Sequence, residues 1–258
     1  MAPHPDIFDI ASTDSAAIAG TRRLIRIAVH PGTVRAVVAD DVHHFRVEIH
    51  HDNQVVTGYR TEALRIPFSL CDMAGGRLQQ LVGQPLTPRI TDIHRQVDGR
   101  QQCTHQFDLA ALAVVAAARQ RSRGYDLVVS DPVEKQCDAW LRRDDGFILH
   151  WRIDRNIICA PEPYARLNVG SGFTDWVSHT CDDDDAEAAL TLRRAHFISR
   201  GRGMLDEINA RTHAPDRGGC WVQQPERAEK AMSLTLLPTE GKTPRILNAT
   251  DAHWLAEV

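Results

Sequence analysis

The chain has 258 residues, of which 43% are hydrophobic and 25% are charged, a composition typical of a globular protein with a real core. The formal net charge is −4, and no basic stripe interleaved with aromatic residues is present, so the composition argues against a nucleic-acid-binding protein. The longest apolar run, residues 109–118, is shorter than the roughly 20 residues that a membrane-spanning helix needs. Because the N-terminal region is acidic and lacks a basic n-region, we expect no signal peptide, a cytoplasmic location and reduced cysteines.

Residues 22–66 show the pattern of an antiparallel β-meander. Short apolar runs predict strands at 24–29, 33–39, 43–51 and 55–64. His30-Pro31-Gly32 and Asp52-Asn53 are typical turn sequences between them.

The period of the apolar residues becomes helical after residue 70. The pattern predicts a helix over 71–83 that stops at Gly83, a polar connection over 85–99, and the strongest helix of the chain over 107–119. This order of elements predicts an α+β fold in which an antiparallel β-meander packs against helices.

The rest of the chain shows a similar order. Strands are predicted at 125–130, 137–142, 147–153 and 156–160, and helices at 172–178 and 184–199, the last with the alternative of continuing to Asn209. The same spacing separates Cys103 from Ala110-Ala111-Leu112 and Cys181 from Ala188-Ala189-Leu190, which indicates either a tandem duplication or a chance match. We therefore predict an N-terminal arm (1–21), a first unit with the candidate site (22–122) and a second unit packed on it (123–258).

The most informative local pattern lies at the start of the third predicted strand. If that strand begins at Asp41, the alternation of a strand places Asp41 and His43 on the same inner face as Phe45. A buried carboxylate and imidazole are costly unless they pair or bind something. The alternative is a bulge at Asp40-Asp41 that exposes both groups to water, and the pattern leaves both open.

Two cysteines are predicted at the starts of the two helices that pack on the meander. Cys71 would open the first helix, where terminal N–H groups lower the pKa of a thiol, and Cys103 and His105 lie just ahead of the second. Each cysteine alone is more often a core residue than a ligand. If the helix starts converge on the meander, however, Asp41, His43, Cys71, Cys103 and His105 form a set that suits one zinc or iron ion.

Other motifs are weaker. The segment 218–227, with two glycines and Trp221, is predicted as a late strand that ends in a proline turn, with a ligand-contacting segment as the alternative. Arg193 and His196 could neutralise a substrate carboxylate, but a structural salt bridge is the commoner role for such residues, and we expect that role here. The sequence contains no phosphate loop, nucleophile elbow or dinucleotide fingerprint, so we expect no nucleotide cofactor.

Two resemblances follow from these residues. The stretches 40–45, 102–110 and 218–220 with 224–228 resemble a bacterial family labelled as domain of unknown function 2889, and this resemblance extends over most of the chain. It implies no established activity, although such proteins are loosely associated with bacteria that degrade aromatic or steroid-like compounds.

Residues 33–119 also look like the iron–sulfur scaffold fold of the NifU/IscU type. The placement of Cys71 and Cys103 is similar to that of two scaffold cysteines, and Asp41 falls where the scaffold has an aspartate. The scaffold's first cysteine would be Ala39 or Asp40 here, so one ligand of a three-cysteine cluster site is missing. Substitution by His43 or His105 would favour a stable mononuclear metal.

These observations give two main functional hypotheses, beside a third in which the chain is a plain interaction protein and Asp41 and His43 are structural. The first is an enzyme of bacterial small-molecule catabolism that acts on an aromatic or carboxylate compound by lyase-like or hydrolytic chemistry. A metal held by the residues above would activate water, or His43 or His105 would act as general base with Asp41 as its orienting group and Cys103 nearby. The second is a non-enzymatic scaffold for iron–sulfur or sulfur transfer. The sequence leaves the oligomeric state open, including a homo-oligomer, and also whether the second half carries a site.

Overall fold

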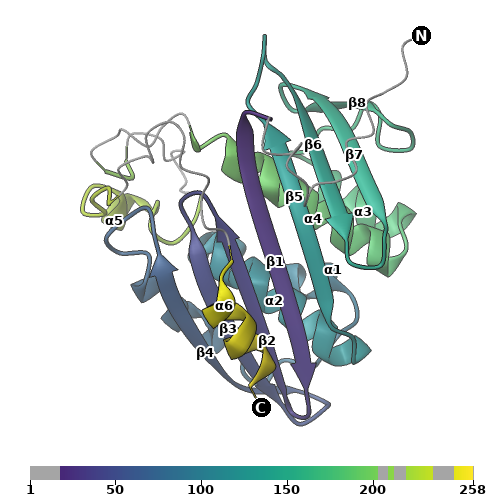
Figure 1. Cartoon of the computed structure of the whole chain (residues 1–258). Helices are drawn as coiled ribbons and strands as arrows, with labels where there is room; N and C mark the ends of the chain where they lie inside the picture. The colour runs from purple at the N-terminus through teal and green to yellow at the C-terminus, as the bar shows by residue number, and fades with distance from the viewer. Residues whose placement is uncertain (1–17, 203–208, 212–218, 235–246, 258) are drawn as a thin grey trace. The chain divides into compact units, whose positions relative to one another are not determined.

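The computed structural model describes residues 18–202, 209–211, 219–234 and 247–257 (Figure 1). Most of the predicted N-terminal arm, the predicted helix extension between 203 and 208, and Gly218 lie outside these residues. The described residues combine antiparallel strands with several helices, which confirms the predicted α+β class. No described helix is both long and apolar enough to cross a membrane.

The chain forms two compact units, which we call the meander unit (24–124 and 201–258) and the middle unit (1–23 and 125–200). We predicted a division near residue 122, and the structure divides the chain at Gly124/Tyr125. The C-terminal residues 201–258 belong to the meander unit, whereas the prediction placed them in the second unit.

The meander unit contains four strands, in the spatial order β4-β3-β2-β1. The predicted strands are present, with their ends shifted by a few residues, and β2 and β3 pair in the predicted antiparallel manner, with Val38 opposite Phe45. Almost every residue of β2 and β3 is buried. Alternation therefore places side chains in two covered layers rather than one buried and one exposed layer. The strands are β1 (Gly20–His30), β2 (Thr33–Asp40), β3 (His44–His51) and β4 (Val56–Arg65).

Helix α2 (Thr104–Arg119) covers the inner face of β2 and β3. Its alanine-rich sequence has high helix propensity, and eleven of its residues are buried. It ends where Gln120 adopts a left-handed conformation, with a φ of 49°. The predicted strong helix is therefore confirmed, and it begins three residues earlier than predicted.

The region between β4 and α2 differs from the prediction. Residues 73–81 form a 3₁₀-helix, η2 (Met73–Leu81), rather than an α-helix. This segment contains Gly75, where an added Cβ would lie 2.3 Å from Thr61 Oγ1 and 2.7 Å from Gln106 Oε1, so only glycine permits the close approach of η2 to β4. The predicted polar connection contains helix α1 (Ile90–Gln96) and the short η3 (Gly99–Gln101). With only Ile90 and Ile93 as buried apolar residues, α1 is too short to show a clear period.

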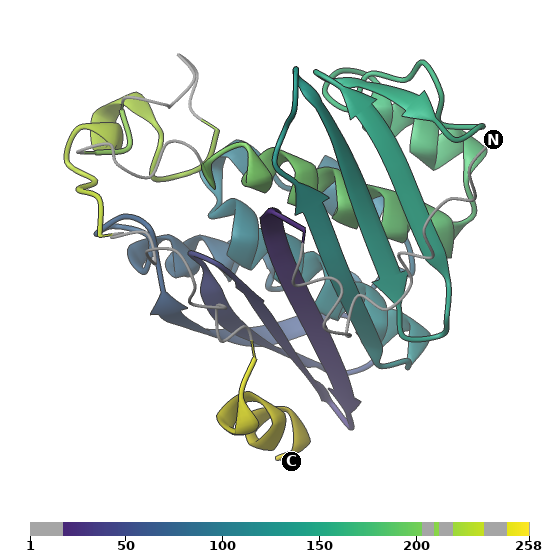
Figure 2. The same cartoon turned by 45° about the horizontal axis from the view of Figure 1, so that its top comes forward.

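Two C-terminal helices complete the meander unit. Segment 219–228 forms turns followed by the short helix α5 (Pro225–Ala228), so the predicted late strand is wrong. Pro225 occupies the first helical turn, where its missing N–H costs nothing. Helix α6 (Ala249–Ala256) was not predicted. It lies against the face of β2 and β3 opposite α2, which explains why both faces are buried (Figures 1 and 2).

The middle unit contains four antiparallel strands in the order β5-β6-β7-β8 and two helices. Helix α4 packs on β6, and it starts at Asp182, whose side chain accepts from the amide of Asp185. The predicted strands and helices are confirmed to within three residues at each end. The elements are β5 (Arg123–Ser130), β6 (Gln136–Arg143), β7 (Ile148–Asp154), β8 (Ile157–Ala160), α3 (Phe173–Thr180) and α4 (Asp183–Ser199). The NifU/IscU likeness and the tandem duplication stay predictions.

Candidate functional site

The candidate site begins in the turn between β2 and β3. Asp40, the last residue of β2, is fully buried. Its Oδ1 accepts hydrogen bonds from the amides of Val42 at 3.0 Å and of His43 at 2.8 Å, the contacts of an aspartate that opens a tight turn. The turn is closed by the amide of Asp40, which donates to the carbonyl of His43 at 2.8 Å.

The same carboxylate oxygen holds the His43 side chain. Nδ1 of His43 lies 2.8 Å from Asp40 Oδ1. An ionised carboxylate oxygen only accepts hydrogen bonds, so Nδ1–H is the donor in this contact and Nε2 is the ring nitrogen that Asp40 does not hold. His43 is nearly buried and shares the inner side of the meander with Phe45, with 6.2 Å between the ring centroids. This confirms that His43 points inward.

A second imidazole comes from the first turn of α2. The rings of His43 and His105 are stacked, with 3.7 Å between centroids and an interplanar angle of 22°. Phe45 lies 5.8 Å from the His105 ring and borders the pair. A neutral imidazole is the form that binds a metal ion or accepts a proton.

Together these residues form one compact group. One ligand atom from each of Asp40, His43 and His105 lies within 4.8 Å of the other two. It is the only such group of three or more potential ligands among the residues that the structure describes. Two histidines and a carboxylate suit zinc or non-haem iron(II). Metal bonds to these ligands are about 2.0–2.2 Å long, so the three side chains would have to move closer together to share one ion.

Two arginines lie at the border of the site. Arg65, the last residue of β4, donates to the main-chain carbonyl of Asp40 and, at 3.4 Å, to that of His43, and so fixes the backbone of the turn. Arg202 Nη1 lies 3.3 Å from Asp41 Oδ2, and its side chain is 37% exposed. The turn therefore has a partly exposed cation beside it.

The structure changes the role of the predicted acid. Asp40, not Asp41, contacts His43, and Asp41 pairs with Arg202. The reason is that β3 begins at His44, so Asp41 lies in the turn, where the alternation of a strand no longer applies. A tight-turn pattern was the available signal for Asp40, because aspartate is favoured at the first position of a turn.

The predicted cysteines lie apart from this group. Cys71 and Cys103 are buried thiols, and Cys71 belongs to an apolar cluster with Phe68 and Val222, against which Cys220 packs. Burial raises the pKa of Cys71 well above its usual value, and the neighbouring Cys103 adds to this shift. Burial also raises the pKa of Cys103 to about 12, although the amides of Gln106 and His105 oppose it. The predicted lowering of the Cys71 pKa by a helix start is therefore wrong, because desolvation outweighs it.

Two histidines of the middle unit provide useful contrasts. His150 Nε2 lies 2.8 Å from Asp138 Oδ1, and its ring stacks on Trp140 at 4.9 Å rather than on a second imidazole. His196 is buried, and its Nδ1 is 3.7 Å from Cys137 Sγ. Burial, together with nearby Arg200, lowers the pKa of His196 to about 4. Arg193 donates to the carbonyls of Val169 and Gly170 at 2.5 and 3.0 Å, which is a structural role within the middle unit.

The comparison with protein families can now be set beside this geometry. Residues 26–120 match the family described as Protein of unknown function (DUF2889). The DUF2889 segment runs from β1 to the end of α2 and includes Asp40, His43 and His105. The predicted resemblance is confirmed for this segment, and the stretch 218–228 lies outside the match. No curated protein and no solved structure matches the chain.

Proposed function

We propose that the chain is an enzyme of small-molecule catabolism in the cytoplasm, with lyase-type or hydrolytic chemistry at a centre formed by Asp40, His43 and His105. The observation that carries the proposal is the close approach of two imidazoles and one carboxylate on the covered side of the meander. Perturbed or clustered titratable groups of this kind occur preferentially at functional sites.

One divalent zinc or iron ion fits this donor set. The ion would supply a Lewis acid and a water molecule of lowered pKa. Asp40 supports the ion in either of two ways: by direct ligation, or by holding His43 Nδ1–H so that Nε2 points its lone pair at the ion. His105 supplies the second imidazole from the first turn of α2.

The same residues also support proton transfer. The Asp40 contact fixes the tautomer of His43, so that Nε2 is the atom that takes a proton from water or from a substrate carbon. Asp40 then stabilises the imidazolium that forms, because its carboxylate lies 2.8 Å from Nδ1. His105, stacked on His43, would repel that imidazolium if it were itself charged, so it acts as a neutral neighbour.

The border of the site favours an anionic substrate. Arg202 is partly exposed beside the turn, and a guanidinium binds a carboxylate in a bidentate manner. Phe45 is fully buried beside the imidazole pair and so is not exposed to a substrate. Within the proposed class of aromatic or carboxylate compounds, Arg202 therefore supports the carboxylate group.

Elemental analysis of full-length protein purified without chelator tests the metal-dependent form of the proposal. We expect about one zinc or iron ion per chain, and a Co²⁺-substituted protein with visible absorption bands that disappear in His105→Ala. His150→Ala is the matched control, since it removes a His–Asp pair of the same length in the middle unit. Less than roughly a tenth of an ion per chain, with activity that EDTA leaves unchanged, would remove the metal and leave the His43 general base.

The proposed alternative, a scaffold for iron–sulfur or sulfur transfer of the NifU/IscU type, gains one supporting observation. Cys220 lies close enough to Cys71 and Cys103 to affect the pKa of each thiol, and so provides a third cysteine that the sequence comparison lacked. The three sulfur atoms are not among the groups with ligand atoms within 4.8 Å in the described residues. Anaerobic reconstitution with iron and sulfide would give a brown protein under the scaffold proposal, and a colourless protein would reject it.

A further inference from the structure

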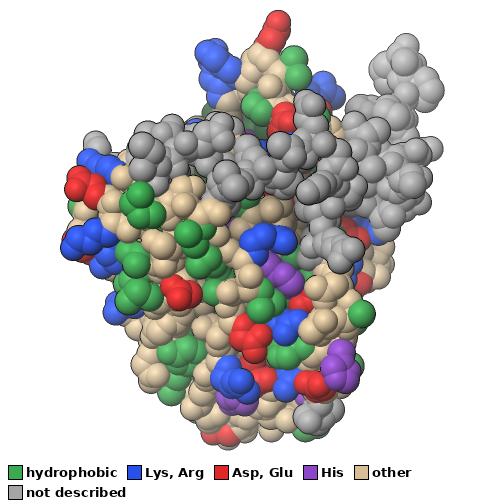
Figure 3. Space-filling view, turned by 60° about the vertical axis from the view of Figure 1, so that its left-hand side comes forward, with side chains coloured by type: hydrophobic (Ala, Val, Ile, Leu, Met, Phe, Trp, Pro, Cys, Tyr) green, Lys and Arg blue, Asp and Glu red, His purple; other side chains and the backbone are tan. Residues whose placement is uncertain are grey.

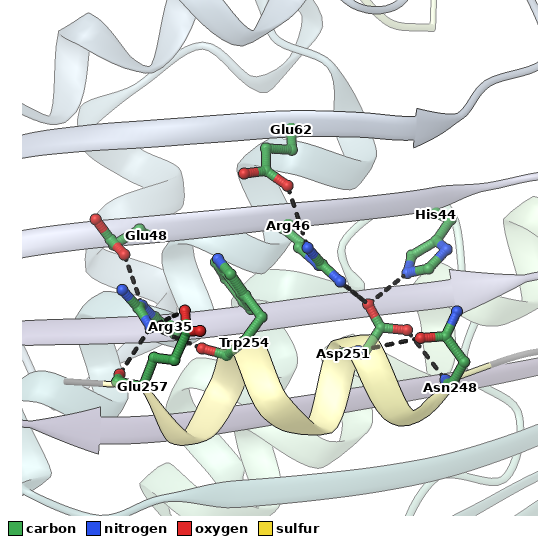
Figure 4. Close-up of polar contacts among 9 residues, drawn as sticks. All are labelled: Arg35, His44, Arg46, Glu48, Glu62, Asn248, Asp251, Trp254 and Glu257. Atoms are coloured by element: carbon green, nitrogen blue, oxygen red, sulfur yellow. Dashed lines mark hydrogen bonds and ion pairs between the residues drawn. The ribbon is translucent and has the colours of Figure 1, made fainter.

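The face of β2 and β3 that α6 covers carries a dense set of charged groups (Figure 4). Its side chains alternate with those of the inner face: His44, Arg46 and Glu48 point outward from β3, and Arg35 does so from β2. Acidic, basic and histidine side chains are also interspersed on the molecular surface seen from the side of β4 (Figure 3). Helix α6 therefore packs on a polar face rather than on an apolar one.

Asp251 of α6 is the centre of the contact. It is fully buried, and its Oδ1 accepts from Arg46 Nη2 at 2.7 Å and Arg46 Nε at 3.0 Å, and lies 3.0 Å from His44 Nε2. Burial alone would raise the pKa of Asp251, but hydrogen bonds from Arg46 and the amide of Asn248 and the nearby His44 hold the pKa below its usual value. The other Asp251 oxygen accepts from the amide of Asn248 and completes a capping box. One carboxylate thus both starts the helix and anchors it.

Trp254 and the end of α6 are recognised by two arginines. The guanidinium carbons of Arg35 and Arg46 lie 5.4 and 5.1 Å from the centroid of the Trp254 ring, within the range of cation–π attraction. Arg35 Nη1 also donates to the carbonyls of Trp254 and Glu257, each at 2.7 Å. This face of the sheet thus binds three groups of α6: the Asp251 carboxylate, the Trp254 indole and the carbonyls at the end of the helix.

Helix α6 has the properties of a segment that can leave the sheet and bind to it again. Helix α6 has eight residues, of which only Asp251 is buried. Helices this short are not stable alone in water, so docking stabilises the helix rather than the core. Ion pairs and hydrogen bonds supply most of the docking contacts, and salt screens those that are partly exposed.

We propose that this face is a binding site for α6 from a second copy of the chain, and that two chains associate by exchanging α6. A second copy is the partner that reproduces every recognised group: Asp251 for His44 and Arg46, Trp254 for the two guanidinium groups, and the helix end for Arg35. Exchange of an identical element between protomers is a low-cost route to a dimer. Because the intramolecular contact has an effective concentration near the millimolar range, the intact chain stays mostly self-docked.

Mixing two full-length variants tests the proposal, because each variant has lost a different half of the contact. Arg46→Ala has a defective face and an intact α6, and Asp251→Asn has an intact face and a defective α6. Neither variant can form the native contact by itself. In the mixture, the α6 of Arg46→Ala can bind to the intact face of Asp251→Asn, which gives one native contact. We expect a heterodimer in sedimentation velocity and native mass spectrometry.

The control is the double variant Arg46→Ala/Asp251→Asn, which forms no dimer with either partner because it can neither donate nor accept α6. Circular dichroism establishes that every variant is folded, and Arg35→Ala with Trp254→Ala provides a second pair. Absence of the heterodimer in mixtures of folded variants at concentrations up to about 1 mM would overturn the proposal. A dimer that also forms with the double variant would overturn it as well.

Discussion

The two sides of the β2–β3 hairpin place adjacent histidines in opposite environments. His43 faces inward, where it contacts the Asp40 carboxylate and stacks on His105. His44 faces outward and contacts Asp251, which is also bound by Arg46. Asp251 is paired with a permanent cation, whereas Asp40 is paired with an imidazole whose proton a metal ion can replace. The outer cluster thus fixes a helix, whereas the inner cluster has the donor set on which the proposed metal or proton-transfer centre rests.

Removal of the inner carboxylate should have the largest effect. In Asp40→Ala, the amides of Val42 and His43 and the Nδ1 of His43 lose their acceptor in a buried site. We expect the free energy of unfolding to fall by about 3–5 kcal/mol, since buried unsatisfied donors are costly. Urea denaturation measures this, and Asp40→Asn, which keeps one acceptor oxygen, should recover part of the stability but not metal binding.

His43 and His44 each contact a carboxylate, whereas the charged neighbour of the buried His196 is Arg200. His196 therefore tests how the charge of the neighbour affects the stability of a chain with a buried histidine. Its pKa of about 4 lies below the usual 6.5, so the unfolded chain binds more protons and stability is lost as pH falls from 6.5 towards 4. This loss amounts to roughly 2–3 kcal/mol. Denaturation between pH 7 and 4 should give a flatter profile for His196→Gln, and parallel profiles would contradict this account.

The contribution of the outer cluster to stability should depend on pH. Because the pKa of Asp251 is lowered on folding, its contribution is fully present above its unfolded pKa near 3.8 and is lost as pH falls through the lower folded value. At pH 7, Asp251→Asn should cost about 1–2 kcal/mol, since α6 adds little to the core. Hydrogen exchange of residues 249–256 should report undocking of α6 in this variant, and protection equal to that of the unchanged chain would contradict the role of Asp251 as the anchor of α6.

The smallest effect is expected at Asp41, the neighbour of Asp40. Its ion pair with Arg202 is partly exposed, with side-chain exposures of 14% and 37%, and such pairs contribute about 0–1 kcal/mol. Asp41→Asn should therefore leave the urea midpoint nearly unchanged. A loss as large as that of Asp40→Ala would show that the sequence-based choice of Asp41 was right after all.

The elements with a regular period were predictable from the sequence. Strands β2 to β4 and helix α2 have clear periods and were placed within a few residues. The inward direction of His43 followed from its alternation with Phe45. Helix α1 was missed because its only buried apolar residues are Ile90 and Ile93, too few to show a helical period. Helix α6 was missed because its buried residue, Asp251, is polar.

The site was only partly predictable, because its acid is defined by a turn and its second imidazole by tertiary packing. The choice of Asp41 assumed a strand that begins three residues too early, whereas Asp40 was recognisable only as a turn-opening residue. The meeting of His105 with His43 depends on how α2 lies on the meander. Cys71 and Cys103 are both buried, and Cys71 belongs to a separate apolar cluster with Phe68 and Val222.

Calorimetric titration of Zn²⁺ into the metal-free full-length chain tests the central claim most directly. The account predicts one strong site per chain that His43→Ala or His105→Ala abolishes, and that His150→Ala leaves intact because that His–Asp pair has no second imidazole. Binding that persists unchanged in both His43→Ala and His105→Ala, or no binding in the unsubstituted chain, would contradict a metal centre at Asp40, His43 and His105.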